Sequence, residues 1–160
     1  MSTSKYLLSA ITAATITLSA SLAPIQTATA SAFADADDAV KYRQQGFQLI
    51  RENFAYMAAM VRGEVPFDGA MFEARAQSLH HLSHVPWDGF RYAGENHRGS
   101  GDAKTELWDN WDDFTARVAQ LQEDTKNLAE ASASHSIGDV RSAFMTTARN
   151  CQQCHERYRD

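Results

Sequence analysis

The chain has 160 residues, of which 44% are hydrophobic and 22% are charged, and its formal net charge is −5 at pH 7. This length and composition fit one globular domain with a core of its own. The acidic balance argues against a nucleic-acid partner, which would select a basic face, and against attraction to anionic lipid. Small molecules and other proteins remain as partners.

The N-terminal segment has the composition of a Sec-type signal peptide. Lys5 precedes an apolar run over residues 6–22 that carries no charge, and Ala-x-Ala sites follow this run. The favoured cleavage sites follow Ala30 or Ala32, with a third site after Ala34. The sequence therefore predicts an exported, periplasmic protein.

An uncleaved membrane anchor is the alternative use of this segment. Serines, threonines and Pro24 interrupt the apolar run before it reaches the ~20 residues that span a bilayer. We therefore divide the chain into a cleaved signal peptide, residues 1–30 with a boundary between 30 and 34, and one domain, residues 31–160, without membrane attachment. Cleavage removes Lys5 and no acidic residue, which makes the mature domain more acidic by one unit.

Four segments carry the apolar periodicity of packed helices. In residues 37–63, apolar side chains recur every seven positions, with a second set three residues later: Val40, Phe47, Phe54 and Val61, then Ile50 and Met57. Residues 67–85 hold a weaker version of the pattern, which ends at Pro86. Residues 107–128 and 140–158 repeat the pattern of the first segment, and the last of them includes both cysteines.

The breaks between these helices are residues 63–66, 86–102 and 134–139, of which only the second is long. No segment alternates with the period of two that a half-buried strand shows, and no internal repeat is present. The sequence predicts an all-α domain, most simply an antiparallel up-down-up-down four-helix bundle.

The residues Cys151-Gln152-Gln153-Cys154-His155 form the CxxCH signature of covalent c-type haem attachment. On a helix, positions i, i+3 and i+4 share one face, so both thiols and the imidazole would meet one porphyrin. The thiols would form thioethers with the haem vinyl groups, and neutral His155 would be an axial ligand of the iron. Both cysteines also occupy core-facing positions of the apolar pattern.

Three other roles for the two cysteines agree less well with the sequence. A structural zinc site needs four ligands, and no second Cys/His pair has ligand spacing, since His80, His81 and His84 lie on the weakest of the four helices. A thioredoxin-type motif should follow a strand and begin a helix, whereas this one lies deep inside a helix. A simple disulfide leaves His155 unexplained. Covalent haem is therefore the favoured prediction.

Beyond the motif, nearly the whole predicted domain resembles the cytochrome c′ family of class II c-type cytochromes. The matching segments are residues 39–44 (AVKYRQ), 85–87 (VPW) with Phe90, 101–103 (GDA), 106–108 (ELW) and 151–159. The CxxCH alone would not separate cytochrome families, whereas its place in the last helix together with these segments is specific. The resemblance implies a four-helix bundle with one covalently bound haem c per chain.

The resemblance also assigns Phe47 to the distal haem pocket, over the open face of the iron. From its periodicity alone, Phe47 could equally be ordinary core packing. Because phenylalanine cannot coordinate iron, the assignment implies a high-spin, five-coordinate haem in a crowded and weakly polar pocket. Low-spin relatives carry a methionine ligand, but Met57 and Met60 lie more than two helical turns beyond Phe47 and are expected to fill the core.

Four polar residues are assigned to the edge and the proximal side of the haem. Arg43 and Gln44 would lie at the propionate edge, although Arg43 could instead extend to solvent along the helix. Asp102 lies near the haem in relatives and is also a plausible N-cap of the third helix. Arg159, four residues after His155, lies in the proximal pocket in the family, but it could also be a solvated charge.

Three features bear on access to this pocket. The 91–101 loop looks longer than in close relatives, and Phe47 stands where many members carry leucine. Gly46, next to Phe47, costs about 1 kcal/mol of helix propensity relative to alanine. This glycine serves either close packing or movement of the Phe47 ring.

Taken together, these assignments predict a periplasmic haem protein that binds nitric oxide and carbon monoxide and can transfer electrons to a periplasmic redox partner. Oxygen should bind poorly, because Phe47 cannot donate a hydrogen bond to it. The alternative is a dedicated electron-transfer class II cytochrome with a six-coordinate haem. No enzyme is expected, because a peroxidase would need a distal acid–base group, and none is evident. The family also implies a homodimer through the first two helices, with Met71 or Phe72 as contributors.

Overall fold

The computed structural model describes residues 33–91 and 101–160. The predicted signal peptide and most of the 91–101 loop therefore lie outside the described residues. Within the described ranges the regular elements are helices, and one isolated antiparallel β-bridge joins Ala103 to Arg159. In the same ranges, no helix combines the length and the apolar content needed to cross a membrane. The prediction of an all-α domain is confirmed for the residues that the structure describes.

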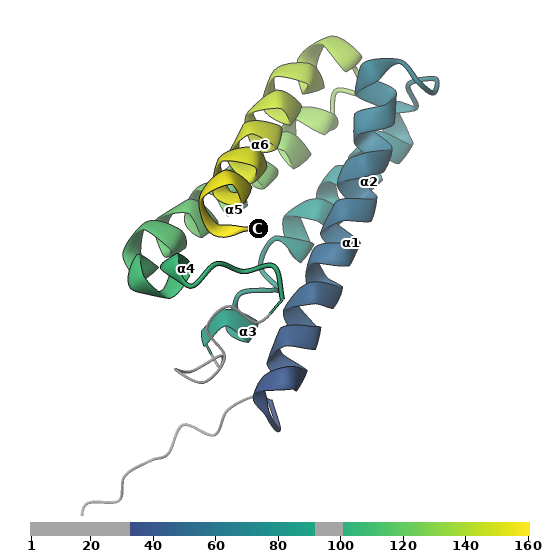
Figure 1. The fold of residues 1–160 in the computed structure, drawn as a ribbon. Helices are drawn as coiled ribbons and strands as arrows, with labels where there is room; N and C mark the ends of the chain where they lie inside the picture. The colour runs from purple at the N-terminus through teal and green to yellow at the C-terminus, as the bar shows by residue number, and fades with distance from the viewer. Residues whose placement is uncertain (1–32, 92–100) are drawn as a thin grey trace, which may run out of the picture. The chain divides into compact units, whose positions relative to one another are not determined.

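The helices follow the chain as α1 (Ala36–Arg62), α2 (Gly69–Leu82), α3 (Asp88–Arg91), α4 (Glu106–Asp109), α5 (Trp111–Ser132) and α6 (Ile137–Tyr158). The four long helices alternate in direction, and α1 packs against α2, α2 against α5, and α5 against α6 (Figure 1). The two short helices lie at the end of the bundle to which the C-terminal end of α6 returns (Figure 1). This is the predicted up-down-up-down four-helix bundle.

Capping residues explain why two of the long helices begin and end where they do. Asp35 accepts a hydrogen bond from the Asp38 N–H at the start of α1, and Asp68 accepts one from the Met71 N–H at the start of α2. Gly63 ends α1 in the left-handed conformation, with φ of 74°, a region that glycine enters without steric cost. The predicted bounds of α1 are therefore correct to within one residue at each end.

The predicted third helix is divided in two. Asn110 leaves the helical conformation, with φ of −121° and ψ of 43°, and separates α4 from α5. Its side-chain Nδ2 donates to the Glu106 carbonyl at 2.8 Å, a local bond that competes with the backbone ladder. The predicted second helix, residues 67–85, is also shortened to Gly69–Leu82, and the predicted 86–102 loop contains the single turn α3.

Two hydrophobic clusters divide the interior along the bundle. The first, which we call the upper core, contains ten buried residues: Met57, Ala58, Met60, Val61, Phe72, Ala76, Leu79, Leu128, Val140 and Phe144. The second, the lower cluster, has four buried residues and seven partly buried ones: Phe90, Leu107, Phe114 and Tyr158, with Phe47, Trp87, Ala103, Trp108, Trp111, Val118 and Cys154. Met57 and Met60 are core fillers, as predicted. Phe72 is fully buried, so the expectation that it contributes to a dimer surface is wrong.

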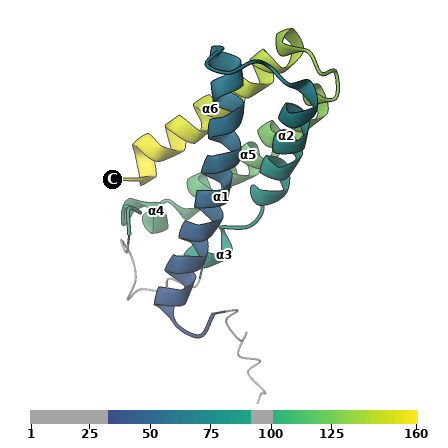
Figure 2. The same ribbon diagram turned by 90° about the vertical axis from the view of Figure 1, so that its right-hand side faces the viewer.

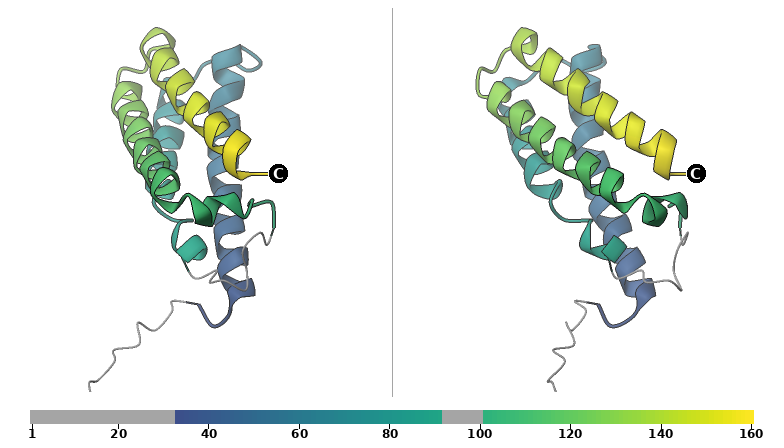
Figure 3. Two further views of the ribbon diagram at one scale, coloured as in Figure 1. Left: turned by 60° about the vertical axis from the view of Figure 1, so that its left-hand side comes forward. Right: turned by 90° about the vertical axis from the view of Figure 1, so that its left-hand side faces the viewer.

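Helices α1 and α6 meet in the upper core, where the rings of Phe54 and Phe144 stack with centroids 4.6 Å apart. From that contact α6 runs obliquely to α1, as Figures 2 and 3 show, so the C-terminal turns of α6 leave the axis of α1. The cysteines lie on these turns. Helix α5 accompanies α6 along its length, and it supplies Phe114 and Val118 to the lower cluster (Figure 3).

Two glycines allow the segment that contains α3 to press against α1. A Cβ atom at Gly89 would lie 2.6 Å from the Ala39 carbonyl oxygen, and one at Gly46 would lie 3.1 Å from Pro86 Cγ. Of the two alternatives for Gly46, the structure therefore supports close packing. Trp87 and Phe90, on the packed segment, are held beside Phe47 as a result.

Candidate functional site

Cys151, Cys154 and His155 lie in the last two turns of α6, where the helical spacing puts the three side chains on one side of the helix. The two cysteines are half-buried and are not joined by a disulfide, and His155 is exposed. Cys154 packs into the lower cluster. The structure therefore supports an arrangement in which the thiols face the interior and the imidazole lies at its border.

The environment of the thiols keeps them protonated at neutral pH. Burial, and then the neighbouring Cys154, raise the pKa of Cys151 to about 11. Burial also raises the pKa of Cys154, against the opposing effect of the Arg117 charge. Because the thiolate is the reactive form in disulfide exchange, these upward pKa shifts argue against a redox-active pair.

The environment of His155 favours the neutral imidazole. Partial desolvation of the ring, and secondly the positive charge of Arg159, lower the pKa of His155. Neutral imidazole is the form that donates a nitrogen lone pair to a metal. His155 is therefore in the state that an axial ligand requires.

Phe47, predicted as the distal residue, lies in the same cluster as Cys154. Its ring meets Trp87 edge-on at a centroid distance of 5.4 Å and Phe90 at 6.1 Å. Phe90 continues the cluster to Phe114, 5.2 Å away on α5. Side chains from α1, α3, α5 and α6 thus form one largely aromatic cluster that includes Cys154.

Arg43, one turn before Phe47, is 3% exposed. Its Nη1 donates to the Gly89 carbonyl at 3.1 Å, and its guanidinium lies over the ring of Phe90, 4.6 Å from the centroid. The alternative in which Arg43 extends to solvent is therefore excluded, because the side chain turns inward toward α3. Burial lowers the pKa of Arg43. Its pairing with a haem propionate stays a prediction.

A short strap, residues 101–104, brings Gln44, Asp102 and Arg159 to one edge of the site. Gln44 Nε2 lies against Gly101, 3.0 Å from where a Cβ atom would be. Asp102 pairs with Arg159 at 3.0 Å, and its carbonyl accepts from the Asp160 N–H at 2.9 Å. Arg159 is consequently ion-paired, although both side chains are exposed.

The predicted N-cap role of Asp102 is wrong. Helix α4 begins four residues later, at Glu106, with Thr105 at the N-cap and no side-chain capping bond. The reason is that the strap is extended: the Lys104 N–H donates to the Tyr158 carbonyl at 3.0 Å, and Ala103 bridges to Arg159. Asp102 is thereby placed over the end of α6.

A polar network beside Cys154 is not apparent from the sequence. The buried Tyr158 donates its hydroxyl hydrogen to Asp113, which also accepts from Arg117 Nε at 2.8 Å and pairs with Arg157 at 3.2 Å. These bonds join the first turns of α5 to the last turn of α6. The spacing of four residues between Asp113 and Arg117 predicts an ion pair on one helix, but it does not predict the contact of Asp113 with Tyr158.

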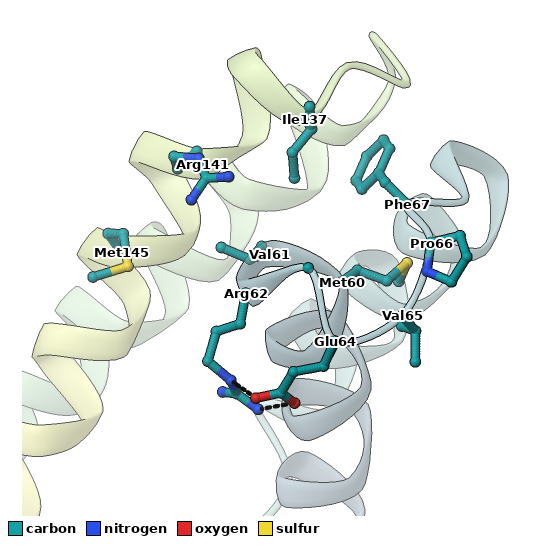
Figure 4. Close-up of a pocket in the computed structure, with 11 residues that line it drawn as sticks. Met60, Val61, Arg62, Glu64, Val65, Pro66, Phe67, Ile137, Arg141 and Met145 are labelled. Carbon is teal, nitrogen blue, oxygen red and sulfur yellow. Dashed lines mark hydrogen bonds and ion pairs between the residues drawn. The ribbon is translucent and has the colours of Figure 1, made fainter.

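A separate cavity of about 1010 Å³ lies at the opposite end of the bundle, between the α1–α2 connection and the start of α6 (Figure 4). Its lining includes Val61, Phe67, Ile137 and Arg141, and the Arg62–Glu64 ion pair closes one side. This cavity is formed around the upper core, away from Cys154. In the described ranges, no three His, Cys, Asp or Glu side chains converge to hold a metal ion.

The residues of the lower cluster fit a covalent haem. The Cys154 thiol packs into the aromatic cluster, the half-buried Cys151 thiol lies next to it, a neutral imidazole lies beside them, and Arg43 carries a positive charge within one turn of Phe47. When bound, the haem would supply an iron centre that binds small ligands and exchanges electrons. Cys151 and Cys154 would hold it, and His155 would coordinate it.

A family model described as cytochrome C′ matches residues 38–159. Among curated relatives, cytochrome c′ of Alcaligenes xylosoxydans xylosoxydans is 34% identical over 127 residues, which cover 79% of this chain and 97% of the relative. Cytochrome c′ of Halomonas halodenitrificans is 27% identical over 130 residues, and this match covers 79% of this chain and 98% of the relative.

The fold agrees with these relationships. The solved cytochrome c prime from Shewanella frigidimarina superimposes with a TM-score of 0.75 at 34% identity, and the match covers 80% of this chain and 98% of that structure. Sequence, fold and the thiol–imidazole arrangement on α6 thus agree. The chain belongs to the cytochrome c′ family, and its cofactor is a covalently bound haem c.

Proposed function

We propose that the protein is a periplasmic, high-spin haem protein that binds nitric oxide and carbon monoxide at a five-coordinate iron and can also transfer electrons. The observation that carries this proposal is the position of Phe47, whose ring lies in the same cluster as Cys154. His155 supplies one ligand nitrogen. Phe47, which has no donor atom for iron, covers the opposite side and leaves that coordination position to small molecules.

The positions of the methionines support the open coordination site. Within the described residues, Met57 and Met60 are buried in the upper core, while Met71 and Met145 are 38% and 47% exposed. None of these four belongs to the lower cluster. A methionine sixth ligand, which the alternative electron-transfer cytochrome would need, would require rearrangement of α1, α2 or α6.

The polarity of the lower cluster favours nitric oxide and carbon monoxide over oxygen. Of the three tryptophans in this cluster, Trp87 donates from Nε1 to the Ser83 carbonyl and Trp108 donates from Nε1 to the Phe90 carbonyl, so these two indole donors are already engaged. Bound oxygen carries partial negative charge, so the absence of a hydrogen-bond donor weakens oxygen binding more than it weakens binding of nitric oxide or carbon monoxide. Solved structures of cytochrome c prime from Alcaligenes xylosoxidans, 34% identical to this chain, include nitric oxide complexes.

We also propose that the protein has no enzymatic activity of the peroxidase type. Such chemistry requires an acid–base side chain within hydrogen-bond reach of the reacting atoms. The rings that surround Phe47, those of Trp87 and Phe90, cannot provide one. Arg43 remains protonated at neutral pH even though burial lowers its pKa, so it acts as a fixed charge.

Absorption and EPR spectra of the matured protein test the coordination state. The ferric protein should give a high-spin EPR signal, and the ferrous protein should bind nitric oxide and carbon monoxide without loss of a protein ligand from the distal side. A six-coordinate, low-spin resting spectrum would overturn the gas-binding proposal in favour of the dedicated electron-transfer cytochrome. Oxygen exposure of the ferrous protein should give oxidation without a stable oxygen complex.

Export and assembly are parts of the same proposal. Expression with a cytochrome maturation system should place the haem protein in the periplasmic fraction, with its N-terminus at residue 31 or 33. The proposed homodimer would use the outer faces of α1 and α2, where Leu49, Tyr56 and Met71 are exposed. Sedimentation of the wild type and of Leu49→Glu tests this, because a charge at that face should produce monomers.

A further inference from the structure

A histidine pair that the haem site does not use lies at the C-terminal end of α2, with His80 in its last turn and His84 just beyond its C-cap, Ser83. His80 and His84 are four residues apart, and their ring centroids are 5.3 Å apart at an interplanar angle of 80°. His80 is half-buried and His84 is exposed, so the pair is open to solvent. We propose that His80 and His84 chelate a divalent transition-metal ion, Zn²⁺, Cu²⁺ or Ni²⁺, at a surface site separate from the haem.

The separation of the two rings fits chelation. Two imidazoles bound to one tetrahedral ion at about 2.1 Å would have ring centres about 5.2 Å apart. The observed separation of 5.3 Å matches this value. His81 lies 5.6 Å from His80 but is its immediate neighbour, and adjacent positions on a helix do not face a common point. The ligands are therefore His80 and His84.

His80 is also held in the orientation of a metal ligand. Its Nδ1 lies 3.4 Å from Thr125 Oγ1 on α5. A protein partner on one ring nitrogen fixes the tautomer and leaves the other nitrogen as the ligand atom. The Nε2 atom of His80 is consequently the coordinating atom.

The position at the end of α2 favours a cation. Carbonyl groups at a helix C-terminus carry partial negative charge, and His80 lies in the last turn of this 14-residue helix. The nearby Lys126 opposes this effect, but its ammonium is close to both Glu123, at 3.8 Å, and Glu130, at 4.0 Å. Two protein ligands leave the other coordination positions to water, so the ion binds more weakly than at a four-ligand structural site.

Titration calorimetry with Zn²⁺ on the matured haem protein tests the proposal. We expect one ion per chain, and we expect affinity to fall at least tenfold in His84→Ala, an exposed position whose replacement leaves the fold intact. His81→Ala is the matched control, because it removes a histidine from the same turn, and it should bind as the wild type does. The unchanged haem spectrum of each variant would show that the haem site is intact.

Two results would overturn the proposal. Equal affinities of the wild type and His84→Ala would place the bound zinc elsewhere, and equal losses in His81→Ala and His84→Ala would exclude the His80–His84 pair as the chelate. His80→Ala provides the second variant and should match His84→Ala. The measurement does not depend on gas binding, so the coordination state of the haem has no bearing on it.

Discussion

At the scale of single residues, two phenylalanines of α1 occupy equivalent positions of the apolar pattern but different environments. Phe47 packs edge-on against Trp87 in the lower cluster, and Phe54, seven residues later, stacks on Phe144 in the upper core. Replacing Phe47 by alanine removes the ring that covers the distal side. Carbon monoxide association with the ferrous protein should then become at least ten times faster, as measured by stopped-flow absorption.

Phe54→Ala is the matched control for this experiment. It deletes a ring of the same size from the same helix, so it should lower the free energy of unfolding by about 3 kcal/mol. Its carbon monoxide association rate should equal that of the wild type. Equal rates in Phe47→Ala and the wild type would mean that Phe47 does not cover the iron.

Asp113 makes stability depend on pH in the acidic range. Hydrogen bonds from Arg117, and then from Tyr158, lower the pKa of Asp113 below its ordinary value of 3.8. A carboxyl group whose pKa is lowered by folding stabilises the protein above its unfolded pKa, and this contribution is lost as the pH falls through the folded pKa. Asp113→Asn should therefore be less stable than the wild type at pH 5 to 7, and the difference should shrink below about pH 4.

Denaturant unfolding of both proteins at a series of pH values measures this difference. Asp112→Asn, in the same first turn of α5, is the control for loss of a negative charge at a helix N-terminus. It should differ less from the wild type at neutral pH. A difference for Asp113→Asn that stays constant down to pH 3 would contradict the assignment of the network.

At the scale of the elements, the attachment of α3 to α1 depends on Gly89. A Cβ atom at position 89 would lie 2.6 Å from the backbone carbonyl oxygen of Ala39. The backbone cannot move aside as a flexible side chain can. Gly89→Ala should therefore lower the free energy of unfolding by about 1 to 3 kcal/mol. It should also alter the carbon monoxide association rate, because Trp87 and Phe90 flank Phe47.

Gly138→Ala is the control for this substitution. Gly138 lies in the first turn of α6, and the nearest atom to its added Cβ would be Ser136 Oγ at 3.6 Å, an ordinary contact distance. Alanine has the higher helix propensity, so this variant should be as stable as the wild type or more stable. Chemical denaturation compares both glycine variants. Equal stability of Gly89→Ala and Gly138→Ala would contradict the close approach of α3 to α1.

The long helices could be predicted from the sequence because their signals are local. The heptad spacing of α1 and α6 marks the buried face, and residues such as Asp35 and Gly63 mark the ends of α1. The break at Asn110 could not be predicted in this way, since the apolar pattern passes through it without interruption. Helix α3 has a single turn, which is too short for periodicity to identify.

The same distinction applies to the candidate site. The CxxCH motif is local, so Cys151, Cys154 and His155 could be identified from spacing alone. Phe47 needed the family resemblance, and the structure then brought it into the cluster of Cys154. The partners of Arg43 and Asp102 come from chain segments 46 and 57 residues away, and no local pattern encodes a contact at such separations.

At the scale of the whole molecule, the division into an upper core and a lower cluster separates stability from haem chemistry. Phe72 is fully buried in the upper core, so Phe72→Ala should lower the free energy of unfolding by about 3 to 5 kcal/mol. The haem absorption spectrum and the carbon monoxide association rate should remain those of the wild type, since Phe72 does not belong to the lower cluster.

Met71→Ala, at the neighbouring position of α2, is the control. Met71 is 38% exposed, and its truncation should change the free energy of unfolding of the monomer much less than that of Phe72. Thermal unfolding followed by far-UV circular dichroism compares the two variants. A shifted haem spectrum in folded Phe72→Ala would show that the two clusters are coupled.

The distribution of the tryptophans gives the molecule an internal optical probe. All three tryptophans of the chain, Trp87, Trp108 and Trp111, belong to the lower cluster. Haem absorbs where indole emits, so energy transfer to an attached haem quenches the emission of all three. Bright fluorescence from a purified sample therefore marks chains that lack haem or have lost their structure around α3 and α4. The upper core, which has no tryptophan, contributes nothing to the signal, and its unfolding is followed by circular dichroism instead.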